Sequence, residues 1–249
     1  MSDFQDRLDF QDCQDYYLGM IKGILLDFNG VIIDDEPIQC RAYREILEAE
    51  GIEVTDEAYL ASLGMDDKTF VEAAYERAGK TPETNKVLEI TNAKTSRWRD
   101  IIAGEMPLFP NTRNFVEKMS EEFALGIVSM AKREEIEYVL ETAGLEKFFS
   151  VIVSAEQVTH CKPHPECYKI GFRLLDLART SAGHLPMTHG ECLVIEDSPP
   201  GIISAKTNGL RTLGVTNTVA AEALRDAGAE AVAANLDDWF PASVRRVFD

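Results

Sequence analysis

Two stretches of the chain place carboxylic acids directly after short apolar runs. Asp27 follows Ile24–Leu26, and the pair Glu196–Asp197 follows Leu193–Ile195. A buried parallel strand delivers the residue at its carboxyl end to the edge where open α/β sheets bind ligands, so we expect the three acids to meet there. Together they would form a hard oxygen site suited to Mg²⁺, with Asp27 as a nucleophile or a metal ligand. The alternative is that they are loop acids that cap a turn or a helix.

Ser129 and Lys162 would add anion-binding groups to these acids. Ser129 closes the apolar run Leu125–Val128 just before a helical segment, where a hydroxyl and backbone N–H groups can bind phosphate. The plainer interpretation is a helix N-cap. Lys162 begins the sequence Lys-Pro-His-Pro-Glu, whose two prolines restrict how the lysine points. Such a lysine can neutralise charge on a transferring group, whereas most lysines are simply solvated.

The segment around Lys162 also carries His160, Cys161 and His164, which are residue types that bind zinc. No fourth ligand is near in the sequence and the prolines disturb helical spacing, so we do not favour a zinc site. The five cysteines of the chain are odd in number and form no Cys-x-x-Cys pair, which indicates reduced thiols rather than a disulfide framework.

The elements that position these residues alternate between strand and helix, which is typical of a parallel sheet with crossover helices. The predicted strands are Ile21–Phe28, Leu125–Ser129, Val151–Ser154, Cys192–Glu196, Thr212–Val215 and Ala231–Ala233. The predicted helices between them are Thr112–Glu122, Lys132–Ala143, Pro165–Leu177, Pro200–Asn208 and Ala220–Ala227. The expected fold class is therefore α/β, with a Rossmann-like parallel-sheet core.

About a hundred residues between the first two strands interrupt this alternation. Four segments there have apolar residues at spacings of three and four, as amphipathic helices do: Pro37–Glu50, Asp56–Leu63, Asp67–Ala78 and Glu83–Ala103. We expect a four-helix cap domain over residues 35–106, inserted into a core of residues 20–34 and 107–249. Residues 1–19 are expected to form a flexible N-terminal extension. A cap placed over the strand ends can open and close on a substrate.

The formal net charge is −18, from 25 basic and 43 acidic residues. Such a surface repels nucleic acid and anionic membranes, so neither is an expected partner. There is no apolar run of membrane-spanning length and no apolar signal segment, so we expect a cytoplasmic protein. We also expect a monomer or a weak homodimer. An anionic substrate would need local cations or a metal in order to bind.

Four motifs occur in order over about 170 residues: Asp-x-Asn-Gly-Val from Asp27, the strand-end Ser129, Lys-Pro-x-Pro-Glu from Lys162, and Glu-Asp-Ser-x-x-Gly from Glu196. Through these motifs the chain resembles the haloacid dehalogenase-like hydrolase superfamily from Met20 to its C-terminus. The helical insertion resembles the cap of the branch that holds phosphoglycolate phosphatases, sugar-phosphate phosphatases and beta-phosphoglucomutase.

The resemblance implies that Asp27 attacks phosphorus and forms an aspartyl-phosphate, which water then hydrolyses. It implies Mg²⁺ held by Asp27, the main-chain oxygen of Asn29 and Asp197, with Glu196 bound directly or through water. The implied catalytic residues are Asp27, Asn29, Ser129 and Lys162. The implied substrate-binding residues are Gly30, Gln39, Gly64, Ser129, Met130, Ala131 and Lys162.

Asn29 is the one residue of these motifs that does not fit a fully active phosphatase. The family usually has aspartate here, which protonates the leaving group and then activates water, and an amide can do neither. Loss of a general acid–base group typically costs on the order of 10²–10⁴ in rate. We interpret Asn29 as an engineered substitution that traps substrate, a natural loss that leaves a weak enzyme or a binder, or a position whose role another group fills. We favour the first two.

The predicted cap also departs from the mutase pattern. Gln39 stands where the mutase would place a histidine, and the loop Gly64–Lys68 lacks the arginine expected to hold a second phosphate. The sequence therefore predicts a Mg²⁺-dependent phosphatase of a small phosphorylated metabolite, such as a sugar or polyol phosphate, with activity impaired by Asn29. The alternatives are a beta-phosphoglucomutase-like mutase and a catalytically silent protein that binds phosphate esters.

Overall fold

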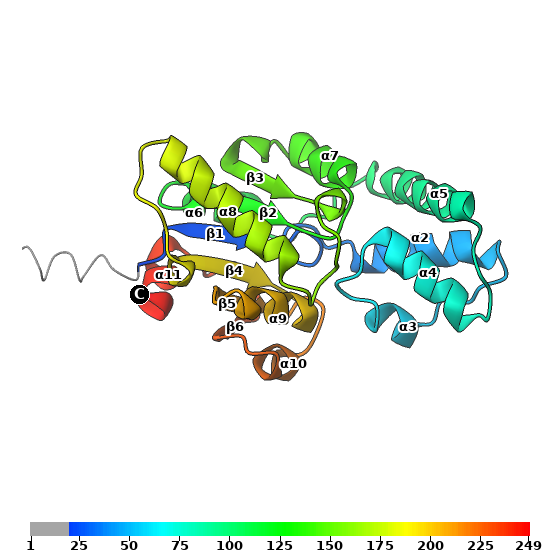
Figure 1. The fold of residues 1–249 in the computed structure, drawn as a ribbon. Coiled ribbons are helices and arrows are strands. Elements are labelled where there is room, and N and C mark those ends of the chain that lie inside the picture. Colours follow the sequence, from blue (N-terminus) through cyan, green and yellow to red (C-terminus); the bar gives the residue numbers. More distant parts are fainter. Residues whose placement is uncertain (1–19) are drawn as a thin grey trace, which may run out of the picture.

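The computed structural model describes residues 20–249, and its centre is a six-stranded parallel sheet (Figure 1). In chain order the strands are β1 (Gly23–Leu26), β2 (Ala124–Val128), β3 (Phe149–Val153), β4 (Cys192–Glu196), β5 (Arg211–Val215) and β6 (Ala231–Ala233). Their spatial order is β3-β2-β1-β4-β5-β6. Strand order therefore reverses at β1, and the α/β, Rossmann-like fold expected from the sequence is confirmed.

Helices cover both faces of this sheet. On one face lie α6 (Thr112–Ser120), α7 (Arg133–Ala143) and α11 (Pro241–Phe248). On the other lie α8 (Glu166–Ser181) and α9 (Pro199–Thr207), while α10 (Ala221–Asp226) packs against β5 and β6. Three 3-10 turns complete the core: η1 (Glu146–Phe148), η2 (Ala155–Gln157) and η3 (His189–Glu191). No helix within residues 20–249 is both long and apolar enough to cross a bilayer.

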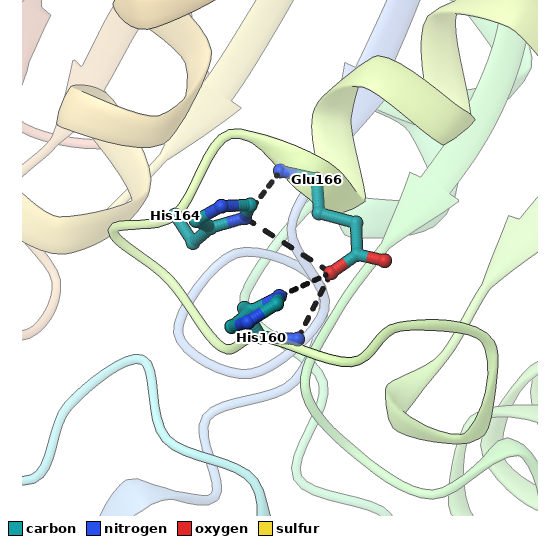
Figure 2. Close-up of side chains that lie close together, drawn as sticks. All are labelled: His160, His164 and Glu166. Atoms are coloured by element: carbon teal, nitrogen blue, oxygen red, sulfur yellow. Dashed lines mark hydrogen bonds and ion pairs between the residues drawn. The ribbon is translucent and has the colours of Figure 1, made fainter.

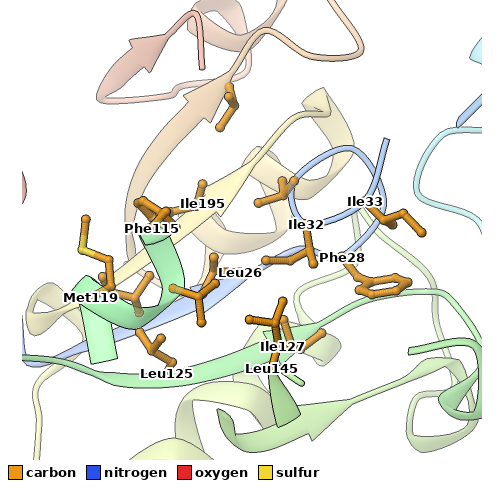
Figure 3. Packing of buried hydrophobic residues seen from close by; sticks show 14 of the residues in the cluster. Leu26, Phe28, Ile32, Ile33, Phe115, Met119, Leu125, Ile127, Leu145 and Ile195 are labelled. Carbon is orange, nitrogen blue, oxygen red and sulfur yellow. The ribbon is translucent and has the colours of Figure 1, made fainter. Parts of the chain in front are cut away.

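Consecutive residues of β1 point to opposite faces of the sheet, as the period of a strand requires. Ile24 and Leu26 belong to one hydrophobic cluster, and Leu25 belongs to the other. Figure 3 shows the first cluster, in which Leu26 lies near Phe115 and Met119 of α6. Because β1 is buried on both faces, its sequence is an unbroken apolar run rather than an alternating one.

Gly171 allows α8 to pack closely against β2. A Cβ there would lie 2.5 Å from Cγ2 of Val128. Gly171→Ala gains up to about 1 kcal/mol of helix propensity, but overpacking a core costs about 1–3 kcal/mol. We expect urea denaturation to show a net loss of roughly 1–2 kcal/mol in the free energy of unfolding. Gly104→Ala is the control, because a Cβ there meets no described atom within 4 Å. Equal stability of the two variants would contradict close packing of α8.

Between β1 and α6 the chain forms four helices that lie beyond the carboxyl ends of the strands (Figure 1). They are α2 (Glu36–Glu48), α3 (Asp56–Leu60), α4 (Asp67–Arg77) and α5 (Thr84–Ile102). A separate hydrophobic cluster, which includes Tyr43, Leu47, Phe70 and Ile90, holds them together. We call these helices and their connections the cap. They fall within the predicted range 35–106, whose bounds as a domain stay a prediction.

The two chain segments that connect the core to the cap run side by side. Ile33 forms an antiparallel bridge with Leu108, and the N–H of Asp34 donates to the carbonyl of Pro107 over 2.7 Å. Helix α5 also reaches the core, because the fully buried Trp98 belongs to the same cluster as Ile24 of β1. The cap is therefore tied to the sheet by a paired hinge and by one helix.

Several predicted bounds need correction. The first strand ends at Leu26 rather than Phe28, because the N–H groups of Val31, Ile32 and Ile33 all donate to the carbonyl of Phe28 and turn the chain there. Helix α3 ends at Leu60 rather than Leu63. Helix α11 was not predicted, although it buries its own apolar side chains Val244 and Phe248 against the core. The predicted extension 1–19 lies outside the described residues.

Candidate active site

Asp27 lies just past the end of β1, where its N–H donates to the carbonyl of Ile195 over 3.0 Å. Its side chain is 11% exposed. Oδ1 accepts from the N–H of Phe28 at 2.8 Å, and Oδ2 lies 2.9 Å from Nζ of Lys162. Burial, and then the charge of Glu196, raise the pKa of Asp27 to about 7, against the lowering effect of Lys162. A buried carboxylate with one oxygen beside a lysine is well placed for nucleophilic attack.

Glu196 and Asp197 end β4 beside Asp27, and the three side chains have oxygens within 4.8 Å of one another. Glu196 is fully buried and accepts from Nζ of Lys162 at 2.6 Å, from the hydroxyl of Tyr168 at 2.8 Å and from the hydroxyl of Ser198 at 2.9 Å. Asp197 accepts from the hydroxyl of Thr218. Burial, followed by the charges of Glu196 and Asp27, raises the pKa of Asp197.

Two glycines make room for these acids. A Cβ on Gly30 would lie 1.8 Å from Oδ2 of Asp197, and a Cβ on Gly201 would lie 1.8 Å from Oε1 of Glu196. Gly30 also has a φ of +73°, which L side chains rarely adopt. The glycines of the Asp-x-Asn-Gly and Glu-Asp-Ser-x-x-Gly motifs therefore allow the chain to approach the carboxylates closely.

Ser129 directly follows β2 and precedes α7 in the chain. Its hydroxyl oxygen accepts from the N–H of Ala131 at 3.0 Å, and it lies 3.4 Å from Oδ1 of Asn29. Met130 and Ala131 follow it along the wall of the same pocket as Asp27. The predicted phosphate-binding corner and the predicted nucleophile are thus neighbours in space.

Lys162 is held by the turn that precedes α8, and its peptide bond to Pro163 is cis. Its Nζ is almost completely buried and contacts both Asp27 and Glu196. Figure 2 shows Glu166 joining the two ends of this turn: its Oε2 accepts from the N–H of His160 at 2.9 Å and lies 3.1 Å from that residue's Nδ1. The rings of His160 and His164 lie 4.4 Å apart. This exposed cluster shapes the turn that presents Lys162.

Cys161 does not join the two histidines. Its sulfur faces the cap, where it lies 3.3 Å from the N–H of Asp66 and 3.5 Å from the hydroxyl of Thr69. The third group beside the histidines is instead the carboxylate of Glu166. The thiol and the two imidazoles are close along the chain, but the turn separates the thiol from them in space.

Asp35 contacts Asn29 and was not predicted as a site residue. The side-chain Nδ2 of Asn29 donates to both oxygens of Asp35, at 2.9 and 3.0 Å. Asp35 Oδ2 also accepts from Nε2 of Gln39 at 2.9 Å and from Nε1 of Trp98 at 2.8 Å. The carboxylate is completely buried, and burial raises its pKa to about 6 against the lowering effect of these hydrogen bonds. In the sequence it is hidden within the acidic run Asp34–Glu36.

A pocket with about 690 Å³ of empty space lies between core and cap. From the predicted site it is lined by Asp27, Asn29, Gln39, Gly64, Ser129, Met130, Ala131, Lys162 and Asp197. Of the predicted site residues, all of which lie in the described part of the chain, Gly30 and Glu196 do not line this pocket. Gly30 packs beneath Asp197, and Glu196 is enclosed by the groups that donate to it. The strand ends and the cap thus contribute to one pocket.

A buried ion cluster on the cap side of this pocket was also missed. Lys94 of α5 lies 2.7 Å from Oδ1 of Asp67 and 3.1 Å from Oε1 of Glu135, which belongs to α7 of the core. Thr95 donates to the same Glu135 oxygen over 2.7 Å, and Tyr43 donates to Asp67. Helix periodicity alone gave no signal for these contacts, because they join side chains on four separate helices, α2, α4, α5 and α7.

Comparison with known proteins agrees with this geometry. The family model of haloacid dehalogenase-like hydrolases matches residues 24–215, which span every motif of the site. The chain belongs to this family. Its phosphorylated carbohydrates phosphatase relative from Thermotoga maritima is 28% identical over 214 residues, covering 85% of this hydrolase and 94% of the relative. Hexitol phosphatase B of Escherichia coli K12 is 29% identical over 198 residues, which cover 78% of this chain and 83% of the relative.

This hydrolase matches only part of another relative. It is 27% identical over 217 residues to the chloroplastic protein Suppressor of Quenching 1 of Arabidopsis thaliana, covering 84% of this chain but 19% of that protein. In structure, beta-phosphoglucomutase from Clostridium difficile superposes with a TM-score of 0.79 at 19% identity, covering 92% and 97% of the two chains. At that identity the likeness shows a shared fold. The resemblance to the helical-cap branch is confirmed.

Proposed function

We propose that this hydrolase is a Mg²⁺-dependent phosphatase of small phosphorylated metabolites, such as sugar or polyol phosphates, and that Asp27 is its nucleophile. The observation that carries the proposal is the position of Asp27 in the pocket. Asp27 lies 2.9 Å from Nζ of Lys162, shares the pocket with Ser129 of the predicted phosphate corner, and has two further acids beside it. The named relatives that act on phosphorylated carbohydrates and hexitols support the same substrate class.

The residues beside Asp27 fit Mg²⁺, which prefers oxygen ligands. Asp27, Glu196 and Asp197 offer only oxygens, and the ammonium of Lys162 pairs with the first two of these three buried carboxyl groups. Asp27, Asp197 and the main-chain oxygen of Asn29 would hold the ion, and Glu196 would act through water because its oxygens already accept from Lys162, Tyr168 and Ser198. When bound, the ion supplies positive charge that offsets repulsion between carboxylate and phosphate.

In the proposed reaction a carboxylate oxygen of Asp27 forms a bond to phosphorus while the bond from phosphorus to the ester oxygen breaks. The hydroxyl of Ser129, the backbone N–H groups that follow it and Nζ of Lys162 hold the phosphoryl oxygens, where negative charge lies throughout. Water then attacks the aspartyl-phosphate, which releases inorganic phosphate and restores Asp27. The leaving oxygen must gain a proton in the first half, and the attacking water must lose one in the second.

We further propose that Asn29 is the resident residue of this site and that it limits turnover. Its Nδ2 is turned toward Asp35, so its side chain offers the pocket a carbonyl oxygen, which can orient a proton donor but cannot transfer a proton. If position 29 had been aspartate until a single engineered change, two buried carboxylates, at positions 29 and 35, would have faced each other in the original protein. Asp35 instead accepts from the Asn29 amide on both of its oxygens. This pairing favours a natural loss of the acid over an engineered substitution.

A catalytically silent phosphate-ester binder is the second candidate, and the amide of Asn29 is the observation that favours it. A beta-phosphoglucomutase-like mutase has less support, because Gln39 occupies the position of the expected proton-shuttling histidine and its Nε2 is engaged by Asp35. Cytoplasmic location, the lack of nucleic-acid and membrane partners, and a monomeric or weakly dimeric state stay predictions from the sequence.

Phosphate release in the presence of Mg²⁺ tests the proposed reaction. The chain is expected to hydrolyse some members of a panel of sugar, polyol and aryl phosphates slowly, to lose this activity in EDTA, and to regain it with Mg²⁺. Asp27→Asn is expected to reduce turnover to background because it removes the nucleophile. Asp226→Asn, an exposed change on α10, is the matched control.

Three outcomes would overturn parts of this proposal. Activity that survives Asp27→Asn would show that Asp27 is not the nucleophile. Conversion of glucose 1-phosphate that requires an added bisphosphate would indicate the mutase instead. Tight binding of phosphate esters with no phosphate release, even after an acid is restored at position 29, would identify the silent binder.

A further inference from the structure

Asp35 fixes the direction in which two amides of the pocket point. Trp98 Nε1 can only donate a hydrogen bond, so Asp35 Oδ2, at 2.8 Å from it, is an acceptor. Gln39 faces this same oxygen and must therefore present its nitrogen, Nε2, at 2.9 Å. Asn29 presents Nδ2 to both oxygens in the same way. The carbonyl oxygens of both amides are thereby turned away from Asp35, and both residues line the pocket.

Two oxygens at the wall of the pocket, within the described residues 20–249, are buried and form no hydrogen bond: Oε1 of Gln39 and Oδ2 of Asp67. The second of them lies 3.9 Å from Nζ of Lys132, which is an ion-pair distance rather than a hydrogen bond. Gln39 is 6% exposed, so water does not compensate its oxygen freely. A buried acceptor without a donor is unfavourable, and a ligand that supplies the donor relieves this. Both residues line the same pocket as Asp27, so the leaving group of a substrate bound there is the candidate for that ligand.

The charges around these oxygens disfavour a second anion. Away from the phosphoryl end, the pocket is lined by the carboxyl groups of Glu36, Asp67 and Glu135 and by one ammonium, that of Lys94. Lys94 is already paired with Asp67 at 2.7 Å and with Glu135 at 3.1 Å. A carboxylate or a second phosphate on the substrate would meet like charges in a poorly solvated space, where repulsion is strong.

We propose that the pocket selects phosphate monoesters whose leaving group is neutral and polyhydroxylated, with hydroxyls that donate to Oε1 of Gln39 and Oδ2 of Asp67, and that it discriminates against substrates with a second anionic group. Asp35 is the positioning residue that makes Gln39 an acceptor. The expected differences in kcat/KM rest on the proposed phosphatase function. The same preference for neutral, polyhydroxylated esters is expected in their binding.

Steady-state kinetics with Mg²⁺ on four esters tests this selectivity. Sorbitol 6-phosphate is a neutral polyol ester, phosphoglycolate carries a carboxylate, fructose 1,6-bisphosphate carries a second phosphate, and p-nitrophenyl phosphate has no alcohol hydroxyl. We expect kcat/KM for sorbitol 6-phosphate to exceed those for phosphoglycolate and the bisphosphate by about tenfold or more. Equal or reversed values would overturn the proposal.

Two variants connect the preference to the named oxygens. Gln39→Met keeps the size of the side chain but removes the acceptor, together with the hydrogen bond from Nε2 to Asp35, so kcat/KM for sorbitol 6-phosphate should fall by about tenfold and by clearly more than kcat/KM for p-nitrophenyl phosphate. Asp67→Asn removes a carboxylate and one of the two partners of Lys94, which stays paired with Glu135, so the ratio of phosphoglycolate to sorbitol 6-phosphate activity should rise severalfold. Glu76→Gln, exposed on α4, is the control. A uniform loss on all four esters would indicate a merely structural role and contradict the proposal.

Isothermal titration separates failure of this inference from failure of the phosphatase function. If no ester is hydrolysed, the phosphatase function fails. Tighter binding of sorbitol 6-phosphate than of phosphoglycolate, weakened by Gln39→Met, would still support the selectivity. If p-nitrophenyl phosphate is hydrolysed but the polyol ester is neither bound nor preferred, the selectivity fails and the phosphatase function stands.

Discussion

Exchanging the two side chains of the Asn29–Asp35 pair, as Asn29→Asp with Asp35→Asn, is expected to raise phosphatase turnover by about 10²–10⁴-fold. The exchange leaves composition and net charge unchanged. It places a carboxylic acid at the position where the family resemblance expects the general acid–base group. The amide now at position 35 keeps the contact between the two side chains, because its nitrogen can donate to the new carboxylate while its oxygen accepts from Trp98 and Gln39.

Asn29→Asp alone is expected to raise phosphatase turnover much less than the double exchange does. In the native chain the Asn29 nitrogen lies 2.9 and 3.0 Å from the oxygens of Asp35, so the single change puts two buried carboxyl groups face to face. Like charges at that distance cannot both ionise, and the new acid is displaced or held in a shared-proton state. Asp35→Asn alone leaves two amides and no acid. The increase in turnover therefore depends on both changes together.

Phosphate release by the native chain, the two single variants and the double variant gives a complete double-mutant cycle. Thermal unfolding of the four proteins shows whether the pairing itself is retained. A double variant no faster than the native chain would show that the amide of Asn29 is not what limits turnover. A single Asn29→Asp variant as fast as the double variant would show that Asp35 does not constrain position 29.

Lys162→Met is expected to destabilise the metal-free protein by about 3–5 kcal/mol, because it leaves Asp27 and Glu196 buried without their counter-charge. Lys162 lies 2.9 Å from the first and 2.6 Å from the second. Urea denaturation in EDTA measures the loss. Lys169→Met, an exposed lysine on α8, should change the free energy of unfolding by less than about 0.5 kcal/mol. Adding Glu196→Gln to Lys162→Met should recover part of the loss, because one of the two charges is removed.

The pH dependence of this loss has a definite sign. Burial already raises the pKa of Asp27 to about 7 with Lys162 present, and removing the lysine removes a lowering effect. A carboxyl group whose folded pKa lies above its unfolded value of 3.8 binds more protons in the native state, so stability falls as pH rises through that interval. The destabilisation by Lys162→Met should therefore be larger at pH 8 than at pH 5. A loss that is equal at the two pH values would show that Asp27 is not the affected group.

The strand-end residues could be predicted because parallel topology brings the carboxyl ends of strands to one edge whatever the details of packing. Asp27, Ser129 and Asp197 follow apolar runs that identify their strands, and they meet as expected. The proline-bounded turn likewise limited where Lys162 could lie. In each case a local pattern, together with a general rule of topology, was sufficient.

The polar groups that complete the site could not be found in this way. Asp35 and Trp98 are 63 residues apart, and their hydrogen bond depends on how α5 packs against the core. Lys94 and Glu135 lie on helices of the cap and of the core, 41 residues apart. The helical pattern of each segment predicts that both side chains are solvated charges, as most lysines and glutamates are. Their burial is a consequence of the cap lying against the sheet, which no local periodicity encodes.

The paired crossings between core and cap have a mechanical consequence. Because Ile33 and Leu108 are bridged and Asp34 is bonded to Pro107, the two connections cannot slide past each other without breaking backbone hydrogen bonds. We expect any opening of the cap to be a rotation about these two connections rather than a sliding motion, and it would also have to separate Lys94 from Glu135. In such a rotation Asp35, which is next to the connections, would move least, and the loop at Gly64, which lies against Pro200 and Lys162, would move most. The hydrogen bonds around Asp35 are therefore expected to keep their arrangement while a ligand enters or leaves.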